Sequence, residues 1–282
     1  MNASSIDWAL LKSVSRSFYL TLRILPAPVR ESIALAYLVA RFSDTVADGA
    51  NTDAETRLLA RRDEIEGWLA ASPDRSNIER VWTTIREGQR FDQDRFSVPG
   101  ASPLNKQELD LYAYLVAGCV GEFWTELCAK KMPRFASRDI AQMTALGIRF
   151  GKGLQLVNIL RDREADSARG RTYVQAERFS EVLAEARGHL QAAREYVRAL
   201  RHYRLRVACA LPLFLADETL GLVEREPFAP RVKVPRQRVW ILLLRALFTG
   251  RICTKDQRTA SVTAPSEAVV TRAAYFANTP RR

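Results

Sequence analysis

Apolar residues recur at intervals of three and four along most of this 282-residue chain, which is the spacing of an α-helix with one buried face. Few segments alternate apolar and polar residues with the period of two that is typical of strands. We therefore expect an all-α protein. The predicted helices cover residues 5–21, 26–48, 52–71, 76–88, 108–131, 137–166 and 180–223.

One domain accounts for all of these helices. The stretch 86–107 carries the densest turn signals, but it is too short to establish a domain boundary. We expect a helical domain over residues 1–260. Residues 261–282 form a C-terminal tail whose order the composition leaves open.

Polar side chains form a stripe along the helix predicted over residues 26–48. Tyr37, Arg41, Asp44 and Asp48 stand at offsets of zero, four, seven and eleven, so they share one face. Two like charges four residues apart cost about 0.2–0.5 kcal/mol on a helix. The two aspartates therefore need a neutralising partner.

A second polar stripe lies on the helix predicted over residues 137–166. Gln155, Asn158, Asp162 and Asp166 share a face of this helix. Leucine, valine and isoleucine flank them, so we expect the helix to be buried on all sides. Buried amides and carboxylates need polar partners, which an apolar core does not supply.

Small residues lie close to the second stripe in the sequence. Gly147, Gly151 and Gly153 each weaken the helix by roughly 1 kcal/mol relative to alanine, and we expect them to leave space beside the stripe. Residues 117–121 include three small side chains at near-helical spacing, which favours close packing against another helix. Tyr112, just before them, is either a core aromatic or a group that relays a proton or stabilises a cation.

Two helices that each carry an Asp-x-x-x-Asp pair can face each other across a cavity. Carboxylates that supply one or two oxygens each, with water and phosphate as the other ligands, are how proteins usually hold Mg²⁺. Such a metal would offset the like-charge cost and bring a diphosphate with it. Four arginines near the pairs would clamp the phosphate oxygens, namely Arg16, Arg41, Arg161 and Arg171. The alternative is that each pair is a solvated helix face.

Composition narrows the partners and the compartment. The formal charge of +11 and the pI near 9.9 suit an anionic partner, which can be nucleic acid, an acidic membrane surface or a phosphorylated metabolite. The four cysteines have no CxxC spacing and the two histidines stand apart, so we expect neither a zinc site nor a disulfide framework. No secretory signal is visible, and the longest apolar run, 239–248, is shorter than the ~20 residues of a membrane span. These features predict a cytoplasmic protein that can associate peripherally with the inner face of a membrane.

Four segments, in order, resemble the squalene and phytoene synthase family, whose helical enzymes join two prenyl diphosphates head to head. They read SRSF (15–18), AYLVARFSDTVAD (36–48), LDLYAYLVAGCVGEFW (109–124) and GLQLVNILRDREADSARGRTYV (153–174). The likeness runs from about Ser13 to Gln237. It implies the all-α isoprenoid synthase fold, with both aspartate motifs lining a central cavity.

The resemblance also implies roles for individual residues. The metal ligands would be Asp44, Asp48, Asn158, Asp162 and Asp166, and the four aspartates with Tyr112 would be the catalytic set. The substrate-binding residues would be Ser15, Arg16, Phe18, Tyr37, Arg41, Gln155, Asn158, Arg161 and Arg171. An apolar tunnel for the prenyl tails would include Phe18, Leu22, Val116 and Leu154.

The implied reaction condenses two farnesyl diphosphates, with Mg²⁺, through presqualene diphosphate to squalene. An allylic cation is attacked by the double bond of the second chain, and loss of a proton closes a cyclopropane, with Tyr112 or the released diphosphate as the base.

The segment RVKVPRQRVW (231–240) resembles the basic loop that squalene synthases use near NADPH, and Lys233 and Arg236 would be its contacts. The alternative is that this segment is a basic surface turn.

Two other functions stay open at this stage. RGRTYV (169–174) looks closer to the phytoene and dehydrosqualene branch, which needs no reductant, and Ala208 and Leu213 depart from the pattern of the animal and fungal squalene synthases. The other alternative is a catalytically silent family member that binds a membrane or a protein complex. We do not expect nucleic-acid binding, because no groove-reading module is visible.

Overall fold

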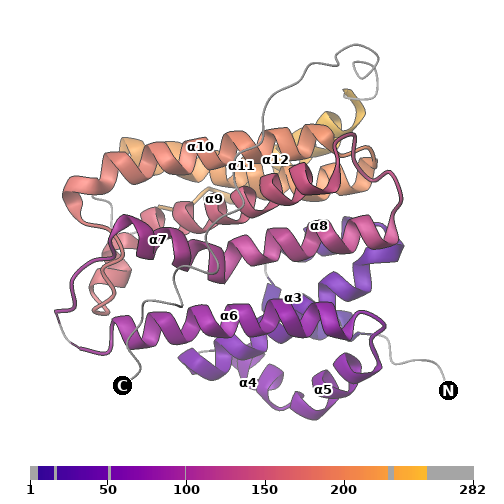
Figure 1. Ribbon diagram of the computed structural model, residues 1–282, viewed down its shortest axis with the longest axis horizontal. Coiled ribbons are helices and arrows are strands. Elements are labelled where there is room, and N and C mark those ends of the chain that lie inside the picture. Colours follow the sequence, from indigo (N-terminus) through magenta and orange to yellow (C-terminus); the bar gives the residue numbers. More distant parts are fainter. Residues whose placement is uncertain (1–5, 16–17, 50–51, 99, 228–231, 253–282) are drawn as a thin grey trace.

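The computed structural model describes residues 6–15, 18–49, 52–98, 100–227 and 232–252 (Figure 1). For residues 47, 48 and 249–252 it describes the backbone alone. The predicted tail, residues 261–282, lies outside the described residues, so the domain boundary near residue 260 stays a prediction.

The described residues form helices without a β-strand, apart from one isolated backbone bridge between Ala136 and Leu200, and the all-α prediction is confirmed. The elements are α1 (Trp8–Ser15), α2 (Phe18–Ile24), α3 (Ala27–Asp48), α4 (Asp53–Leu59), α5 (Arg62–Ala71), α6 (Arg75–Arg95), α7 (Lys106–Ala113), the π-helix η1 (Tyr114–Gly118), α8 (Cys119–Lys131), α9 (Ile140–Ser167), the 3₁₀ turn η2 (Ala176–Arg178), α10 (Phe179–Ala199), α11 (Tyr203–Arg225) and α12 (Arg236–Ile252).

Local signals explain where several helices begin. Pro28 lies in the first turn of α3, where its missing N–H costs no helical hydrogen bond. The Asp139 carboxylate caps α9 by accepting a hydrogen bond from Gln142 N at 2.8 Å. Asn105 and Glu108 form a reciprocal capping box at the start of α7.

Three predicted helices have different boundaries. The segment 52–71 is two helices, because Arg61 leaves the helical conformation with φ −103° and ψ 22°. The segment 180–223 is also two helices, because Leu200 is extended and Arg201 N donates to Phe135 O at 2.7 Å. The helix predicted to end at residue 88 continues to Arg95, so half of the turn-rich stretch is helical.

Helices α8 and α9 pack with their backbones almost in contact. A Cβ atom on Gly121 would lie 1.9 Å from Gly147 O, and one on Gly151 would lie 2.0 Å from Ala117 O. The prediction of close packing by the small residues of 117–121 is therefore confirmed. The expectation of space beside the stripe is confirmed at Gly147 and Gly151, which line the same cavity as Gln155 and Asn158. It is wrong at Gly153, where His189 fills the space.

The helices lie in layers, with α10 and α11 on one side of α9 and α8, and with α6 and α3 on the other side (Figure 1). A single cluster of buried apolar side chains extends from Ile6 in the N-terminal segment to Ala246 in α12. Within the described residues, no helix combines the length and the apolar character needed to cross a bilayer.

Candidate active site

A cavity of about 400 Å³ lies between the layers. Its wall is mostly apolar and comes from helices α2, α3, α6, α8, α9 and α11, with Ala117 of η1 and Tyr196 of α10. Phe18 and Leu154, two of the predicted tunnel residues, line it. Leu22 instead lies fully buried in the core, and Val116 packs beside Gly88 of α6. The cavity suits an apolar chain.

Polar groups gather at one end of this cavity. On each of three helices, a residue that lines the cavity is followed four positions later by a polar residue. The pairs are Ala40 and Asp44 on α3, Ile85 and Gln89 on α6, and Asn158 and Asp162 on α9. Four residues are about one helical turn, so each polar group lies just past the apolar wall on the same face.

Helix α6 joins the two aspartate motifs at this end. Gln89 Nε2 donates a hydrogen bond to Asp44 Oδ1 at 2.6 Å. Asp92 follows Gln89 by three residues, about 4.5 Å along the helix axis, and its Oδ2 lies 3.4 Å from Arg171 Nε. The charge of Asp92 also acts on Asp166. The first and second aspartate motifs therefore meet at the C-terminal end of α6.

The electrostatics of this end fit a divalent cation. Burial raises the pKa of Asp166 to about 6, and the neighbouring charge of Asp162 adds to the shift. A bound cation would relieve both the desolvation and the repulsion. The donors are three carboxylates and the Asn158 amide, and such oxygen ligands suit Mg²⁺. The Asp48 side chain lies outside the described residues, although its backbone continues α3 by one turn beyond Asp44.

The predicted phosphate-clamping arginines pair with carboxylates. Arg41 forms an ion pair with Glu55, and Arg161 Nε donates to Asp162 Oδ1 at 3.0 Å. Arg171 pairs with Asp92, as described above, and Arg16 lies outside the described residues. These pairs balance the negative charge of the polar end, and a phosphate group would have to share or replace the carboxylate partners.

Most of the remaining predicted substrate-binding residues line the cavity, and one is buried in the protein core. Phe18 and Tyr37 line the cavity and stack with ring centroids 5.2 Å apart, and Gln155 and Asn158 line it from α9. Ser15 is buried, and its hydroxyl donates to Leu11 O at 2.6 Å. Asn158 lines the cavity and is exposed, so the expectation that this helix is buried on all sides is wrong at that residue.

Tyr112 belongs to a buried aromatic cluster beside the polar end. Its ring stacks on Tyr173 with centroids 5.2 Å apart, and the two hydroxyl oxygens lie 3.3 Å apart. Tyr173 in turn donates to Asp92 Oδ1 at 2.6 Å. Burial, followed by the charge of Asp92, raises the pKa of Tyr112 above its ordinary value, so the phenol is neutral at pH 7.

Sequence reasoning missed Asp92, Tyr173 and the widened turn of η1. Asp92 follows Ile85 by seven residues, so helical spacing puts it on the cavity side of α6. That signal was hidden because the helix was predicted to end at residue 88. The π-helix η1 had no sequence signal; it follows Tyr112 in the chain, and its Ala117 lines the cavity.

The profile of the family described as squalene/phytoene synthase matches residues 11–182 and 176–238. The chain belongs to the squalene/phytoene synthase family. The squalene synthase of Schizosaccharomyces pombe is 25% identical over 97% of this chain and 69% of its own length. The presqualene diphosphate synthase of Rhodopseudomonas palustris is 29% identical, over 60% of this chain and 62% of its own length.

A solved structure of TcSQS with a bound ligand superposes with a TM-score of 0.71. The superposed residues make up 91% of this chain and 92% of the TcSQS chain. Their sequence identity is 21%, so this likeness establishes the fold alone. The isoprenoid synthase fold that the resemblance implied is thereby confirmed.

Of the two predicted NADPH contacts, Arg236 is the first residue of α12 and Lys233 lies three residues before it. Lys233 and Arg236 are both exposed, and the cavity wall nearest in sequence is formed by Ala208, Cys209 and Pro212 of α11. Of the two residues that depart from the pattern of the animal and fungal squalene synthases, Ala208 borders the cavity, whereas Leu213 is buried in the core.

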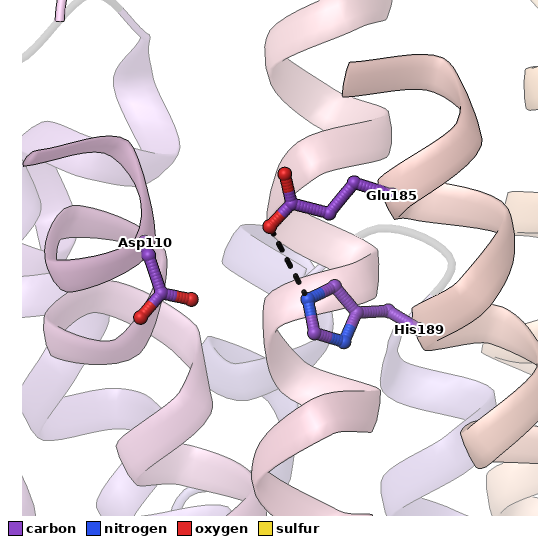
Figure 2. Close-up of side chains that lie close together, drawn as sticks. All are labelled: Asp110, Glu185 and His189. Carbon is purple, nitrogen blue, oxygen red and sulfur yellow. Dashed lines mark ion pairs between the residues drawn. The ribbon is translucent and has the colours of Figure 1, made fainter. Parts of the chain in front are cut away.

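A second group of potential metal ligands lies apart from the aspartate motifs. Glu185 and His189 of α10 face Asp110 of α7 (Figure 2), and their ligand atoms lie within 4.8 Å of one another. Lys152 Nζ already lies 2.6 Å from Asp110 Oδ1. Burial and two nearby cations lower the pKa of His189 to about 4, so its imidazole is neutral at pH 7.

This group does not join the cavity site. His189 packs against Gly153, two residues before Gln155, and residues two apart point about 200° away from each other on a helix. The positive charge of Lys152 also opposes a bound cation at Asp110. The aspartate motifs are therefore the better Mg²⁺ site.

Proposed function

We propose that this prenyltransferase joins two farnesyl diphosphate molecules head to head, through presqualene diphosphate, to give squalene. The observation that carries this proposal is the apolar cavity of about 400 Å³ with both aspartate motifs at its polar end. Apolar prenyl tails fit the wall, and the diphosphate groups fit the end where carboxylates and arginines alternate. The site thus matches an amphiphile with an anionic head.

The residues that would hold Mg²⁺ are Asp44, Asp48, Asn158, Asp162 and Asp166. When bound, the metal would neutralise the leaving diphosphate and lower the barrier to ionisation of the allylic C–O bond. Arg41, Arg161 and Arg171 would contact the phosphate oxygens after exchanging their carboxylate partners. Their charge would stabilise the released diphosphate.

The cavity wall would protect the allylic cation. Its lining is mostly carbon, so little water would compete with the double bond of the second prenyl chain. The stacked rings of Phe18 and Tyr37 present π-electrons to the cavity and can stabilise positive charge. We assign Tyr112, next to the polar end, as the acceptor of the proton that leaves when the cyclopropane closes.

NADPH is the proposed reductant of the second step, and when bound it would supply a hydride. The exposed cationic groups of Lys233 and Arg236 would contact its phosphates. A second candidate function is a reaction that ends at presqualene diphosphate. It is favoured by the similarity to the presqualene diphosphate synthase of Rhodopseudomonas palustris.

Peripheral binding to an anionic membrane is also part of the proposal. Four large apolar side chains of α12 are exposed by 52–61%, namely Trp240, Ile241, Leu244 and Phe248. They share one stripe about 100° wide, while Leu242 and Ala246 face the core. Arg236 lies about 40° beyond one edge of the stripe, where it can contact lipid phosphates while the apolar side chains enter the interface. Arg245 lies about 40° beyond the other edge, with its guanidinium over the ring of Phe214.

The buried thiols of Cys119, Cys128 and Cys209 are free, which suits the reducing cytoplasm. We therefore propose the cytoplasmic side of the membrane as the place of the enzyme.

Product analysis tests the proposed reaction. The protein is incubated with farnesyl diphosphate and Mg²⁺, with and without NADPH, beside its Asp44→Asn variant. Squalene formed only with NADPH supports the main proposal, and presqualene diphosphate under both conditions supports the second candidate. Dehydrosqualene or phytoene would contradict both, and a folded wild-type protein without any product would indicate a catalytically silent family member.

A further inference from the structure

Tyr112, Tyr173 and Asp92 form a buried chain of three oxygen groups behind the polar end. Each residue is less than a tenth exposed. The Tyr173 hydroxyl donates to Asp92 Oδ1 at 2.6 Å, and the Tyr112 and Tyr173 oxygens lie 3.3 Å apart. The chain thus runs from Tyr112, on which the charge of Asp166 at the polar end acts, to a buried carboxylate.

The hydrogen bonds of this chain have one direction. An ionised carboxylate only accepts, so the Tyr173 proton points to Asp92 and the Tyr173 oxygen is left to accept from Tyr112. Arg171, 3.4 Å from Asp92 Oδ2, stabilises the negative charge of that carboxylate. The Tyr112 oxygen therefore keeps its lone pairs for a further partner, and the charge of Asp166 at the polar end already acts on this phenol.

A neutral phenol is a weak base unless its own proton leaves at the same time. Burial raises the pKa of both tyrosines above the ordinary value, so neither is a phenolate at pH 7. We propose that Asp92 accepts the proton of the cyclopropane-forming step, reached through the hydroxyl groups of Tyr112 and Tyr173. This inference rests on the proposed function, and it adds to that function a positioning residue that does not touch the substrate.

Atoms and charges balance in this step. The C–H bond that breaks is on C1 of the ionised prenyl chain, two bonds from the cationic carbon, and its electron pair becomes the C–C bond that closes the three-membered ring at that cationic carbon. The proton goes to the Tyr112 oxygen, the Tyr112 proton goes to Tyr173, and the Tyr173 proton goes to Asp92 Oδ1. The cationic carbon becomes part of an uncharged cyclopropane ring, the diphosphate of the second chain is unchanged, and the carboxylate becomes a neutral acid, with no oxidant or reductant. After product release the proton leaves by the same hydroxyl groups.

The distances suit a relay that tightens on substrate binding. The Tyr173–Asp92 bond is already short, whereas the 3.3 Å between the tyrosine oxygens exceeds the usual O–H···O length of about 2.7–2.8 Å. Catalytic hydrogen bonds are often long without substrate and shorten in the reacting complex.

The test compares presqualene diphosphate formation by Asp92→Asn, Tyr173→Phe and the double variant. Asn keeps the shape of Asp92 and its hydrogen bond from Tyr173, but it is far less basic. We expect each single variant to lower kcat about 100-fold with KM for farnesyl diphosphate within about threefold of wild type. The double variant should be about as slow as either single one, because the groups act as a unit. Asp92→Glu should recover part of the rate.

Two measurements separate proton transfer from a structural role. With substrate deuterated at C1, the isotope effect on kcat should be larger in Asp92→Asn than in wild type, because proton loss becomes rate-limiting. Binding of farnesyl S-thiolodiphosphate, which resists ionisation, and the melting temperature should stay close to wild type in Tyr173→Phe. Asp94→Asn, an exposed substitution on the same helix, is the matched control and should change neither rate nor isotope effect.

A kcat within about threefold of wild type in Asp92→Asn or Tyr173→Phe would overturn the relay and favour diphosphate as the base. So would a rate loss explained entirely by weaker binding of the thiolo analogue. Failure of wild type to form any condensation product would overturn the proposed function together with the relay, whereas an active wild type with active variants would overturn the relay alone.

Discussion

Gln89 Nε2 donates a hydrogen bond to Asp44 Oδ1 at 2.6 Å, and this contact orients the first aspartate of the α3 motif from the neighbouring helix. Gln89 also accepts a hydrogen bond from Ser43 Oγ at 2.9 Å, so its amide is held at both ends. Partners that orient a metal ligand in this way often change metal affinity 10–100-fold when they are removed.

We expect Gln89→Leu to raise the Mg²⁺ concentration needed for half-maximal activity about tenfold, because Asp44 loses its orienting donor. Steady-state rates over a Mg²⁺ titration measure the effect. Gln93→Leu, on an exposed position of the same helix, is the control and should leave the titration unchanged. An unchanged titration in Gln89→Leu would remove Gln89 from the metal site.

Asp44→Asn and Asp162→Asn should each lower turnover at least about 100-fold, because each removes a charged ligand of the proposed metal. The fold should persist, and circular dichroism melting checks this. Asp110→Asn provides a sharp control, since Asp110 belongs to the group in Figure 2 that lies apart from the cavity. If Asp110→Asn were as inactive as Asp44→Asn, the metal would belong to that second group instead.

Because of Asp166, the unfolding free energy of the metal-free protein should gain a contribution in mild acid that is absent at pH 7. Its folded pKa is raised to about 6, so between the unfolded value and pH 6 the folded state binds more protons than the unfolded state. This contribution to the unfolding free energy therefore grows as pH falls from 7 towards 4. Asp166→Asn, which is neutral throughout, should melt at a higher temperature than wild type at pH 7 in EDTA, and the gap should close near pH 4. A lower melting temperature of the variant at pH 7 would contradict the assignment.

Gly121→Ala should destabilise the fold by about 1–3 kcal/mol or more, the usual range for overpacking. Its Cβ would lie 1.9 Å from Gly147 O, so α8 and α9 would have to separate. Urea unfolding measures the loss. Gly67→Ala is the matched control, because it is also helical but has open space around the new methyl group, and it should stabilise by about 0.4–1 kcal/mol. Equal effects of the two substitutions would refute the packing account.

The exposed stripe of α12 should bind anionic lipid. We expect Trp240→Ser with Phe248→Ser to lower co-sedimentation with phosphatidylglycerol vesicles about tenfold, while pure phosphatidylcholine vesicles bind weakly in all cases. Val98→Ser, which removes a single exposed apolar side chain elsewhere, should have no effect. Dimerisation through the stripe, seen as a mass change between wild type and the double variant in sedimentation equilibrium, would contradict the lipid assignment.

Sequence alone determined the fold class and the two stripes that carry the chemistry. The helical period brought Asp44 into line with Tyr37 on one face and Asp162 into line with Gln155 on another, because spacing along a helix is a local property of the chain. The short motifs, read in order, then indicated the family, which the profile match confirmed. Local rules sufficed for these conclusions.

The tertiary structure decided which helix lies between the stripes and which charges face one another. Asp92 contacts Arg171 and Tyr173, which lie 79 and 81 positions later in the chain, and no period within α6 predicts such partners. Glu55 as the partner of Arg41, and the approach of α8 to α9, likewise depend on how separate helices pack. Ion pairs and pKa values are set by distance in space and by burial, and a linear pattern contains neither.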